Sequence, residues 1–191
     1  MASFGFFSLA VLATAFVFQI ATYKTYKSNW TDRTYKIFFW LSIVSVVLFY
    51  LYLVYSRYLG WSTGDGASKF LVPPYTGISY VFGYELSRFL MYYLFALVPA
   101  FALLFSAKHF NRKFGEKFFE NQEPYLGALS VFFLGHPDWG YAWIYYIGVL
   151  LVAAVVLSLV KGHLSKQSER LSLRFLWLPV AILVILINII L

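Results

Sequence analysis

The sequence predicts an all-α integral membrane protein, a bundle of six transmembrane helices formed by one polytopic domain over residues 1–191. Three observations support this fold class: few charged residues, long apolar runs, and basic residues confined to a few segments. Hydrophobic residues make up 61% of the chain and charged residues 12%, whereas globular chains average about 25% charged residues. So few charges cannot cover a water-facing surface. The composition therefore argues against a soluble enzyme domain and against a disordered chain.

The first three apolar runs each reach the roughly 20 residues that a helix needs to cross a bilayer. They predict spans at about residues 2–22, 37–59 and 84–107. The first run has no preceding basic residue, which a secretory signal would carry, so we interpret it as a retained span. Pro99 lies inside the third run, and membrane helices tolerate proline.

The last two long runs predict spans at about residues 140–160 and 173–191. Between these and the third span lies a shorter apolar stretch, residues 125–134, which covers only about half of a ~30 Å hydrocarbon core. This stretch is either a re-entrant segment or the centre of a fourth, short span at about 118–135.

The positions of the basic residues favour the short span. Segments 24–36, 108–123 and 161–174 hold 12 of the 15 Lys and Arg residues, and the positive-inside rule places all three in the cytoplasm. For segments 108–123 and 161–174 to lie on the same side, two crossings must separate them. The run at 140–160 is one crossing, so 118–135 must be the other. We therefore expect six spans in a plasma or inner membrane, with both termini outside. This orientation also accounts for the net charge of +7 without nucleic acid as a partner.

Aromatic residues make up 23% of the chain, and cysteine is missing from it. The aromatic residues gather near span ends, which is typical of the belts that membrane proteins place at headgroup depth. Without cysteine, the chain forms no disulfide, no thiolate metal site and no cysteine nucleophile.

Segment 108–123 combines charges and rings at helical spacing. On a helix, His109, Arg112, Lys113, Glu120 and Glu123 share one face, and phenylalanines occupy the opposite face, so the segment predicts an amphipathic cytoplasmic helix. It is either an extension of the third span or a helix lying in the interface. As alternatives, His109, Glu120 and Glu123 are candidate catalytic residues, and Arg112 and Lys113 are candidate contacts for a lipid or another anion. A docking surface for a partner is a further alternative.

The pair Glu120 and Glu123 precedes Pro124, which suits the first turn of a helix. Negative charge is favourable at a helix N-terminus, so a structural role explains the pair. Carboxylates near a membrane boundary are costly, however, and are often functional. Paired carboxylates can also serve as general acid and base.

On the opposite side of the membrane, residues 135–140 form a turn between the predicted fourth and fifth spans. His136 and Asp138 are candidate catalytic residues, and with Asp65 they are weak candidates for a metal site. A turn in which Asp138 caps the next helix explains the same residues. Glu85 and Arg88 lie three residues apart and can form an ion pair with each other, and Arg88 is an alternative contact for an anionic lipid or substrate.

The sequence favours a non-catalytic subunit or scaffold of a membrane complex. Polar residues deep in the spans are few, and the HExxH and Walker A motifs are missing. The alternatives are an integral membrane enzyme that acts on a lipid or membrane-bound substrate through interfacial His, Glu and Asp residues, and a small transporter or channel component. The expected partners are the lipid bilayer and other protein chains, or further copies of this one. The sequence does not identify a cofactor.

Overall fold

The computed structural model describes residues 2–23, 29–64, 66–115, 119–164 and 173–190, and these residues form helices and turns without a strand. The all-helical prediction is confirmed. Two helical stretches, Trp30–Thr63 and Ser79–Lys113, are long and apolar enough to cross a membrane. The elements in chain order are α1 (Ala2–Ala21), α2 (Asn29–Thr63), η2 (Ala67–Leu71), α3 (Ser79–Glu85), η3 (Leu86–Leu90), α4 (Met91–Lys113), α5 (Glu123–Phe133), η4 (Pro137–Trp139), α6 (Ala142–Leu164) and α7 (Arg174–Ile190).

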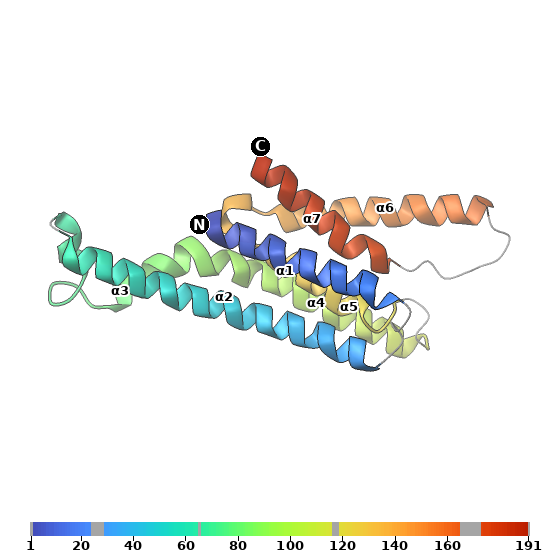
Figure 1. Cartoon of the computed structure of the whole chain (residues 1–191), viewed down its shortest axis with the longest axis horizontal. Coiled ribbons are helices and arrows are strands. Elements are labelled where there is room, and N and C mark those ends of the chain that lie inside the picture. The colour runs from blue at the N-terminus through green and yellow to red at the C-terminus, as the bar shows by residue number, and fades with distance from the viewer. Residues whose placement is uncertain (1, 24–28, 65, 116–118, 165–172, 191) are drawn as a thin grey trace.

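The helices run along a common axis and alternate in direction, with α3, η3 and α4 forming one continuous pass (Figure 1). The ends of α1, α4 and α6 and the starts of α2, α5 and α7 therefore lie toward the same end of the bundle. We name it the basic end, because Lys36, Lys108, Arg112, Lys113 and Arg174 belong to these helix termini. The opposite end is named the hairpin end.

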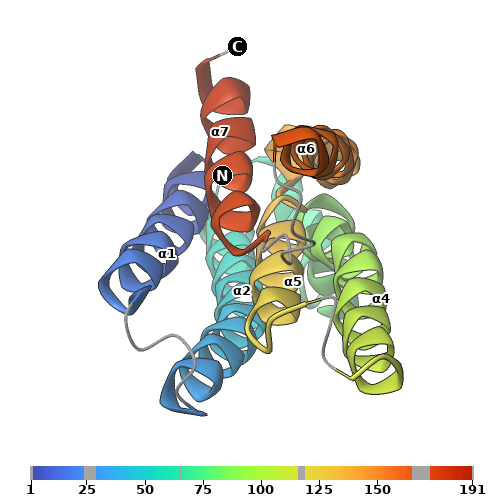
Figure 2. The same cartoon turned by 90° about the vertical axis from the view of Figure 1, so that its right-hand side faces the viewer.

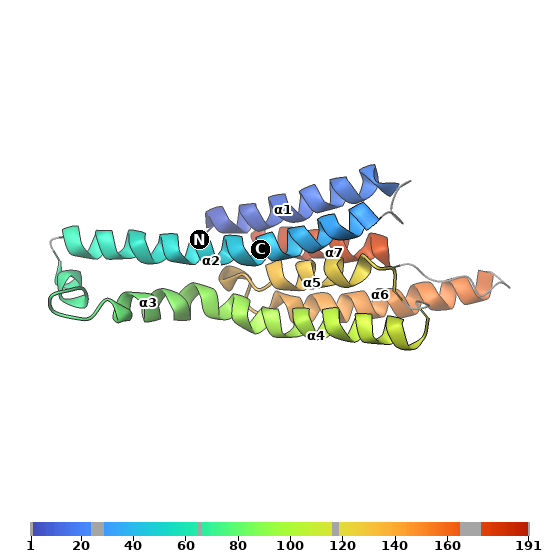
Figure 3. The ribbon, with the colours of Figure 1, turned by 90° about the horizontal axis from the view of Figure 1, so that it is seen from below.

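A long hairpin of α2 and the α3–η3–α4 pass projects beyond the other helices at the hairpin end (Figure 3). α2 has 35 residues and is about 52 Å long at about 1.5 Å per residue. The predicted spans 37–59 and 84–107 are thus the central parts of longer helices. Pro99 lies inside α4 without ending it.

The short helix α5 lies at the centre of the bundle, surrounded by the longer helices (Figure 2). It has 11 residues, of which all but Tyr125 are buried, and it contacts α1, α2, α4, α6 and α7. A helix that is apolar on all sides is stable only when it is buried, which explains its position. The helix is shorter than the predicted span 118–135, and Pro124 occupies its first turn as predicted.

Two glycines allow α5 and the segment after it to approach their neighbours closely. A Cβ atom at Gly135 would lie 2.4 Å from Cβ of Ala96 on α4. A Cβ atom at Gly127 would lie 2.8 Å from the Trp177 ring of α7 and 2.9 Å from Leu103 of α4. Interiors are packed too densely to absorb such overlaps without a shift. These positions therefore require glycine for the observed packing.

Aromatic residues build the core as well as the surface near the helix ends. Phe39 of α2 is completely buried, and its ring lies 5.9 Å from that of Phe101, 6.5 Å from that of Tyr125 and 6.4 Å from that of Phe132. All three ring pairs are tilted or edge-to-face, the arrangement that the aromatic quadrupole favours. The high aromatic content therefore also holds α2, α4 and α5 together.

The predicted amphipathic helix over 108–123 is wrong as a single element. α4 ends at Lys113, and Gly115 follows with a φ of 64°, a left-handed conformation that glycine adopts at low cost. The chain is then non-helical from Phe119 to Gln122. The residues that we expected to share one face are therefore divided between the end of α4 and the start of α5.

Candidate functional site

Buried polar side chains from several parts of the chain converge at the basic end, where α5 begins. Polar groups inside an apolar bundle are costly unless they are paired, so such a concentration is a candidate functional site. We name this cluster the α5 junction. Its members are Gln19 of α1, Thr31 of α2, Asn111 of α4, Glu120 and Gln122 of the segment before α5, Glu123 of α5 and Arg174 of α7.

Asn111 fixes the segment that leads into α5. Its Nδ2 group donates a hydrogen bond to the main-chain carbonyl oxygen of Phe119 over 2.6 Å, and its Oδ1 atom accepts one from the Phe119 amide over 2.8 Å. The side-chain amide therefore pairs with both backbone groups of a single residue, as a neighbouring strand would. This clamp closes the connection between α4 and α5 and positions Glu120 to Glu123.

Two further hydrogen bonds join helices that are distant in the sequence. Gln122 donates through Nε2 to the Thr31 hydroxyl of α2 over 3.1 Å. Gln19 donates through Nε2 to the main-chain carbonyl oxygen of Arg174 over 2.6 Å. All three side chains are almost completely buried. These two bonds join α2 to the start of α5 and α1 to the start of α7.

Arg174 supplies the buried positive charge of the junction. Its side chain is 2% exposed, and Nη1 lies 4.0 Å from Oε2 of Glu120, the outer limit for an ion pair. The hydroxyl of buried Tyr35 also lies close to the guanidinium group. Glu123 is 1% exposed and begins α5, where the helix dipole favours a carboxylate. The junction therefore places two acidic groups, one of them partly exposed, and one arginine near the start of α5.

The structure brings together only some of the residues that we expected to act together. Glu120 and Glu123 belong to the α5 junction, whereas His109 is exposed on α4 outside it. Gln19 was noted in the sequence as an isolated polar residue in the first apolar run that could hydrogen-bond to another helix, and it does so. Arg174 was overlooked as a site residue, because the sequence shows it only as the last basic residue before the final apolar run. Neither pattern indicates the partner.

Arg112 and Lys113 are exposed in the last turn of α4, as a role in anion contact requires. Arg112 lines an open groove of about 350 Å³ beside the α5 junction. Lys108 reaches across this groove, donating to the Tyr125 hydroxyl over 2.6 Å with its ammonium 4.2 Å from the ring centroid. The other lining residues are Asp32, Asn111, Asn121 and Pro124.

His136 lies at the other end of α5, completely buried. Its Nδ1 atom accepts a hydrogen bond from the Asp138 amide over 3.2 Å, so the proton of the neutral ring resides on Nε2. The ring centroid is 4.7 Å from that of Trp139 and 6.3 Å from that of Tyr93. His136 is thus the capping residue of η4, and Asp138, which we expected to cap the next helix, lies in η4 instead.

Of the weak metal candidates, His136 and Asp138 lie close together, with Nδ1 and Oδ2 3.8 Å apart. Asp65 lies outside the described residues. Among the residues that are described, no group of three His, Asp or Glu side chains is arranged to hold a metal ion.

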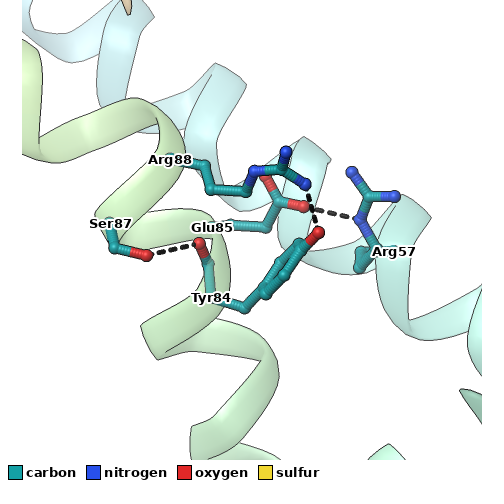
Figure 4. Close-up of polar contacts among 5 residues, drawn as sticks. All are labelled: Arg57, Tyr84, Glu85, Ser87 and Arg88. Atoms are coloured by element: carbon teal, nitrogen blue, oxygen red, sulfur yellow. Dashed lines mark hydrogen bonds and ion pairs between the residues drawn. The ribbon is translucent and has the colours of Figure 1, made fainter.

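The expected ion pair between Glu85 and Arg88 is not formed. Glu85 is completely buried and accepts a hydrogen bond from Nε of Arg57 on α2 over 2.6 Å. Arg88 instead donates to the Tyr84 hydroxyl (Figure 4). The partner from the neighbouring helix replaces the local one because Glu85 faces α2 across the hairpin.

Comparison with protein-family models, with curated proteins and with solved structures gives no match to this chain. Its function is therefore argued from the chemistry of these clusters.

Proposed function

We propose that this chain is a membrane protein that crosses the bilayer six times, with the basic end in the cytoplasm and both termini on the other side. The distance along α4 supports this placement. Along α4, about 27 Å separates Tyr93 from Asn111, at about 1.5 Å per residue. Tyr93 lies beside His136, and Asn111 belongs to the α5 junction. That separation suits a ~30 Å hydrocarbon core, bounded by the α5 junction on one side and the His136 turn on the other.

Within that membrane, we propose that the protein is a non-catalytic subunit or scaffold of a larger complex. One observation carries this proposal: the buried polar side chains hydrogen-bond across helix boundaries. Besides the α5 junction, Ser130 of α5 and Tyr146 of α6 both donate to the carbonyl oxygen of Trp177 on α7, over 3.3 and 3.0 Å. Polar groups used in this way hold a bundle together. A catalytic or transport pathway would direct them toward a substrate.

Labelling of single cysteines tests the topology, because the chain contains no cysteine of its own. We expect a membrane-impermeant maleimide to label Lys69→Cys from outside intact cells and Lys108→Cys only after the membrane is opened. Both positions are exposed in the structure. Labelling of Lys108→Cys from outside would contradict the six-span arrangement, and so would labelling at position 166, in the predicted cytoplasmic segment 161–174.

Purification in a mild detergent tests the assembly role. We expect a complex larger than the 22.1 kDa chain, with another protein chain or further copies of this one in fixed stoichiometry. Native mass spectrometry gives the composition of that complex. A monomer carrying only lipid, with turnover of that lipid, would overturn the scaffold proposal.

The groove beside the α5 junction supports a second candidate, an enzyme that acts on a lipid headgroup at the cytoplasmic surface. Lys108 and Arg112 provide positive charge there, and Glu120 is 21% exposed nearby. For this candidate, Glu120→Gln should abolish lipid turnover in reconstituted vesicles and leave the assembly unchanged. For the scaffold, neither property should depend on Glu120.

A further inference from the structure

Two arginines and a tyrosine form a separate cationic cluster on the projecting hairpin. Arg57 of α2 and Arg88 of η3 both lie against the ring of Tyr84, with their guanidinium carbons 5.4 and 5.1 Å from its centroid (Figure 4). Arginine stacks on an aromatic ring in this way while its N–H groups keep their hydrogen-bonding capacity. With Glu85, the cluster has a net charge of about +1. We name Arg57, Tyr84 and Arg88 the hairpin arginine site.

Glu85 holds Arg57 in a defined orientation. The carboxylate is completely buried and accepts from Nε of Arg57. The terminal nitrogens of Arg57 point away from Glu85 (Figure 4), and its side chain is 38% exposed. Among the described residues, no hydrogen bond involves Nη1 or Nη2 of Arg57, or Nε or Nη2 of Arg88. The site therefore presents several guanidinium donors, fixed in place, that no protein acceptor uses.

The local backbone is also unusual. The residues from Leu86 to Leu90, which include Arg88, form a π-helix in which the Met91 amide donates to the Leu86 carbonyl oxygen. Such insertions cost stability and occur frequently at functional sites. Here the π-helix begins directly after Glu85, so it sets the position of Arg88 relative to the Arg57–Glu85 ion pair.

The position of the hairpin arginine site along the bundle indicates which part of the membrane lies beside it. Arg57 lies about 33 Å along α2 from Tyr35, which is buried beside Arg174 at the basic end. This step rests on the membrane placement proposed above. With that placement, the distance puts Arg57 and Arg88 just beyond a ~30 Å hydrocarbon core, at the level of the outer headgroups. Guanidinium groups match phosphate oxygens in charge and geometry.

We propose that the hairpin arginine site binds a phosphate group, supplied by the phosphodiester of an anionic lipid in the outer leaflet. Arg57 and Arg88 donate to the phosphate oxygens, and Tyr84 keeps the two guanidinium groups at the same surface. Glu85 is a positioning residue that directs Arg57 toward the phosphate.

Native mass spectrometry of the full-length protein, titrated with phosphatidylglycerol or phosphatidylcholine in detergent, tests this proposal. We expect one phosphatidylglycerol molecule to bind preferentially. Arg88→Gln should weaken that binding by at least about tenfold, because it removes a charged hydrogen-bond donor to the phosphate. Lys69→Gln, which removes an exposed charge from the same end of the molecule, is the matched control and should bind like the unaltered protein.

Two substitutions of Arg57 separate geometry from charge. Arg57→Lys keeps the charge but loses the planar fork, so binding should fall nearly as far as in Arg57→Gln. Arg57 is paired with a buried carboxylate, and either change could unfold the hairpin. Arg88 is exposed and has no ion pair with Glu85, so Arg88→Gln decides the question if the Arg57 variants do not fold. Unaltered binding in Arg88→Gln would overturn the proposal.

Inorganic phosphate distinguishes a lipid from a soluble anion. Trp61 lies 5.9 Å from the Arg57 guanidinium and 5.1 Å from the Tyr84 ring, so its fluorescence should respond to an occupied site, with Trp61→Phe as the blank. Binding of phosphatidylglycerol, with or without inorganic phosphate, supports the lipid site. If inorganic phosphate binds and phosphatidylglycerol does not, the site binds phosphate but a lipid is not its source. The cysteine-labelling experiment reports separately on the topology, so failure of one proposal is distinguishable from failure of the other.

Discussion

Gln19 donates a hydrogen bond through Nε2 to the main-chain carbonyl oxygen of Arg174 over 2.6 Å. The bond joins α1 to the first residue of α7, two helices that lie side by side although they are far apart in the sequence (Figure 1). Arg174 in turn places its guanidinium near Glu120, just before α5. Gln19 and Arg174 together thus connect the first and last helices to the segment that leads into the central helix.

Replacement of Gln19 should weaken the bundle. Gln19→Ala removes the hydrogen bond and leaves a cavity at a completely buried position, so we expect a loss of about 2 kcal/mol. Gln19→Leu refills the volume without restoring the bond and should cost about 1 kcal/mol. The measurement is reversible unfolding in mixed micelles with increasing dodecyl sulfate.

Asn188→Ala is the control for this series. Asn188 is exposed, and its amide donates only within α7, to the Val184 carbonyl oxygen, so its replacement should change stability by less than about 0.5 kcal/mol. Equal losses for Gln19→Ala and Asn188→Ala would contradict the role assigned to Gln19.

The clamp formed by Asn111 gives a graded prediction. Asn111→Asp keeps the acceptor for the Phe119 amide but loses the donor to the Phe119 carbonyl oxygen, whereas Asn111→Leu loses both. We expect the leucine variant to be destabilised by about 2 kcal/mol, since two partly buried backbone groups lose their partner. Limited proteolysis should also cut the leucine variant faster between α4 and α5. Uniform cleavage across the series would count against the clamp.

Much of the helical architecture follows from the sequence. The apolar runs predicted every major helix, because a run of that length has few alternatives to a helix in an apolar environment. Pro124 correctly marked the first turn of α5. The end of α4 was predicted less well, because the spacing of charges and rings over 108–123 continues through Gly115. A glycine weakens a helix and marked a possible break there, but the sequence alone did not decide between a break and a continuous helix. The backbone conformation at Gly115 shows that α4 has ended.

The clusters were only partly predictable, because helical spacing identifies neighbours on one helix and not partners on another. The i,i+3 spacing of Glu85 and Arg88 predicted a local ion pair, but packing of α2 against α3 brings Arg57 to Glu85 instead. The sequence singled out Glu120 and Glu123, which lie at the α5 junction, but not Arg174 beside Glu120. That contact depends on the way α7 packs against α5, which no local pattern describes.

His136, a candidate catalytic residue, gives a prediction that separates capping from catalysis. Its Nδ1 atom accepts from the Asp138 amide at the start of η4. The side-chain oxygen of asparagine can accept the same bond, so His136→Asn should retain most of the stability that His136→Leu loses, about 1–2 kcal/mol. Thermal unfolding in detergent compares the two. Equal losses in both variants would contradict the capping role.

The close approach of α4 to the end of α5 gives the sharpest stability test. A Cβ atom at Gly135 would lie 2.4 Å from Ala96 and 3.1 Å from the carbonyl oxygens of Tyr92 and Phe132. Two of these three neighbours are backbone atoms that cannot rotate away, so Gly135→Ala must separate the helices. We expect a loss of about 3 kcal/mol, at the upper end for an overpacked interior.

Gly127→Ala should cost less, about 1–2 kcal/mol, because the atoms that its Cβ would meet belong to the Trp177 ring and the end of Leu103, which can shift. Gly148 on α6 is the matched control: nothing lies within 4 Å of its added Cβ. Gly148→Ala should be neutral or stabilising by up to about 1 kcal/mol, since alanine favours a helix more than glycine does. Unfolding in mixed micelles should therefore rank the variants Gly148→Ala, Gly127→Ala and Gly135→Ala in order of decreasing stability. If Gly135→Ala were as stable as Gly148→Ala, α4 and α5 would not pack as closely as the structure shows.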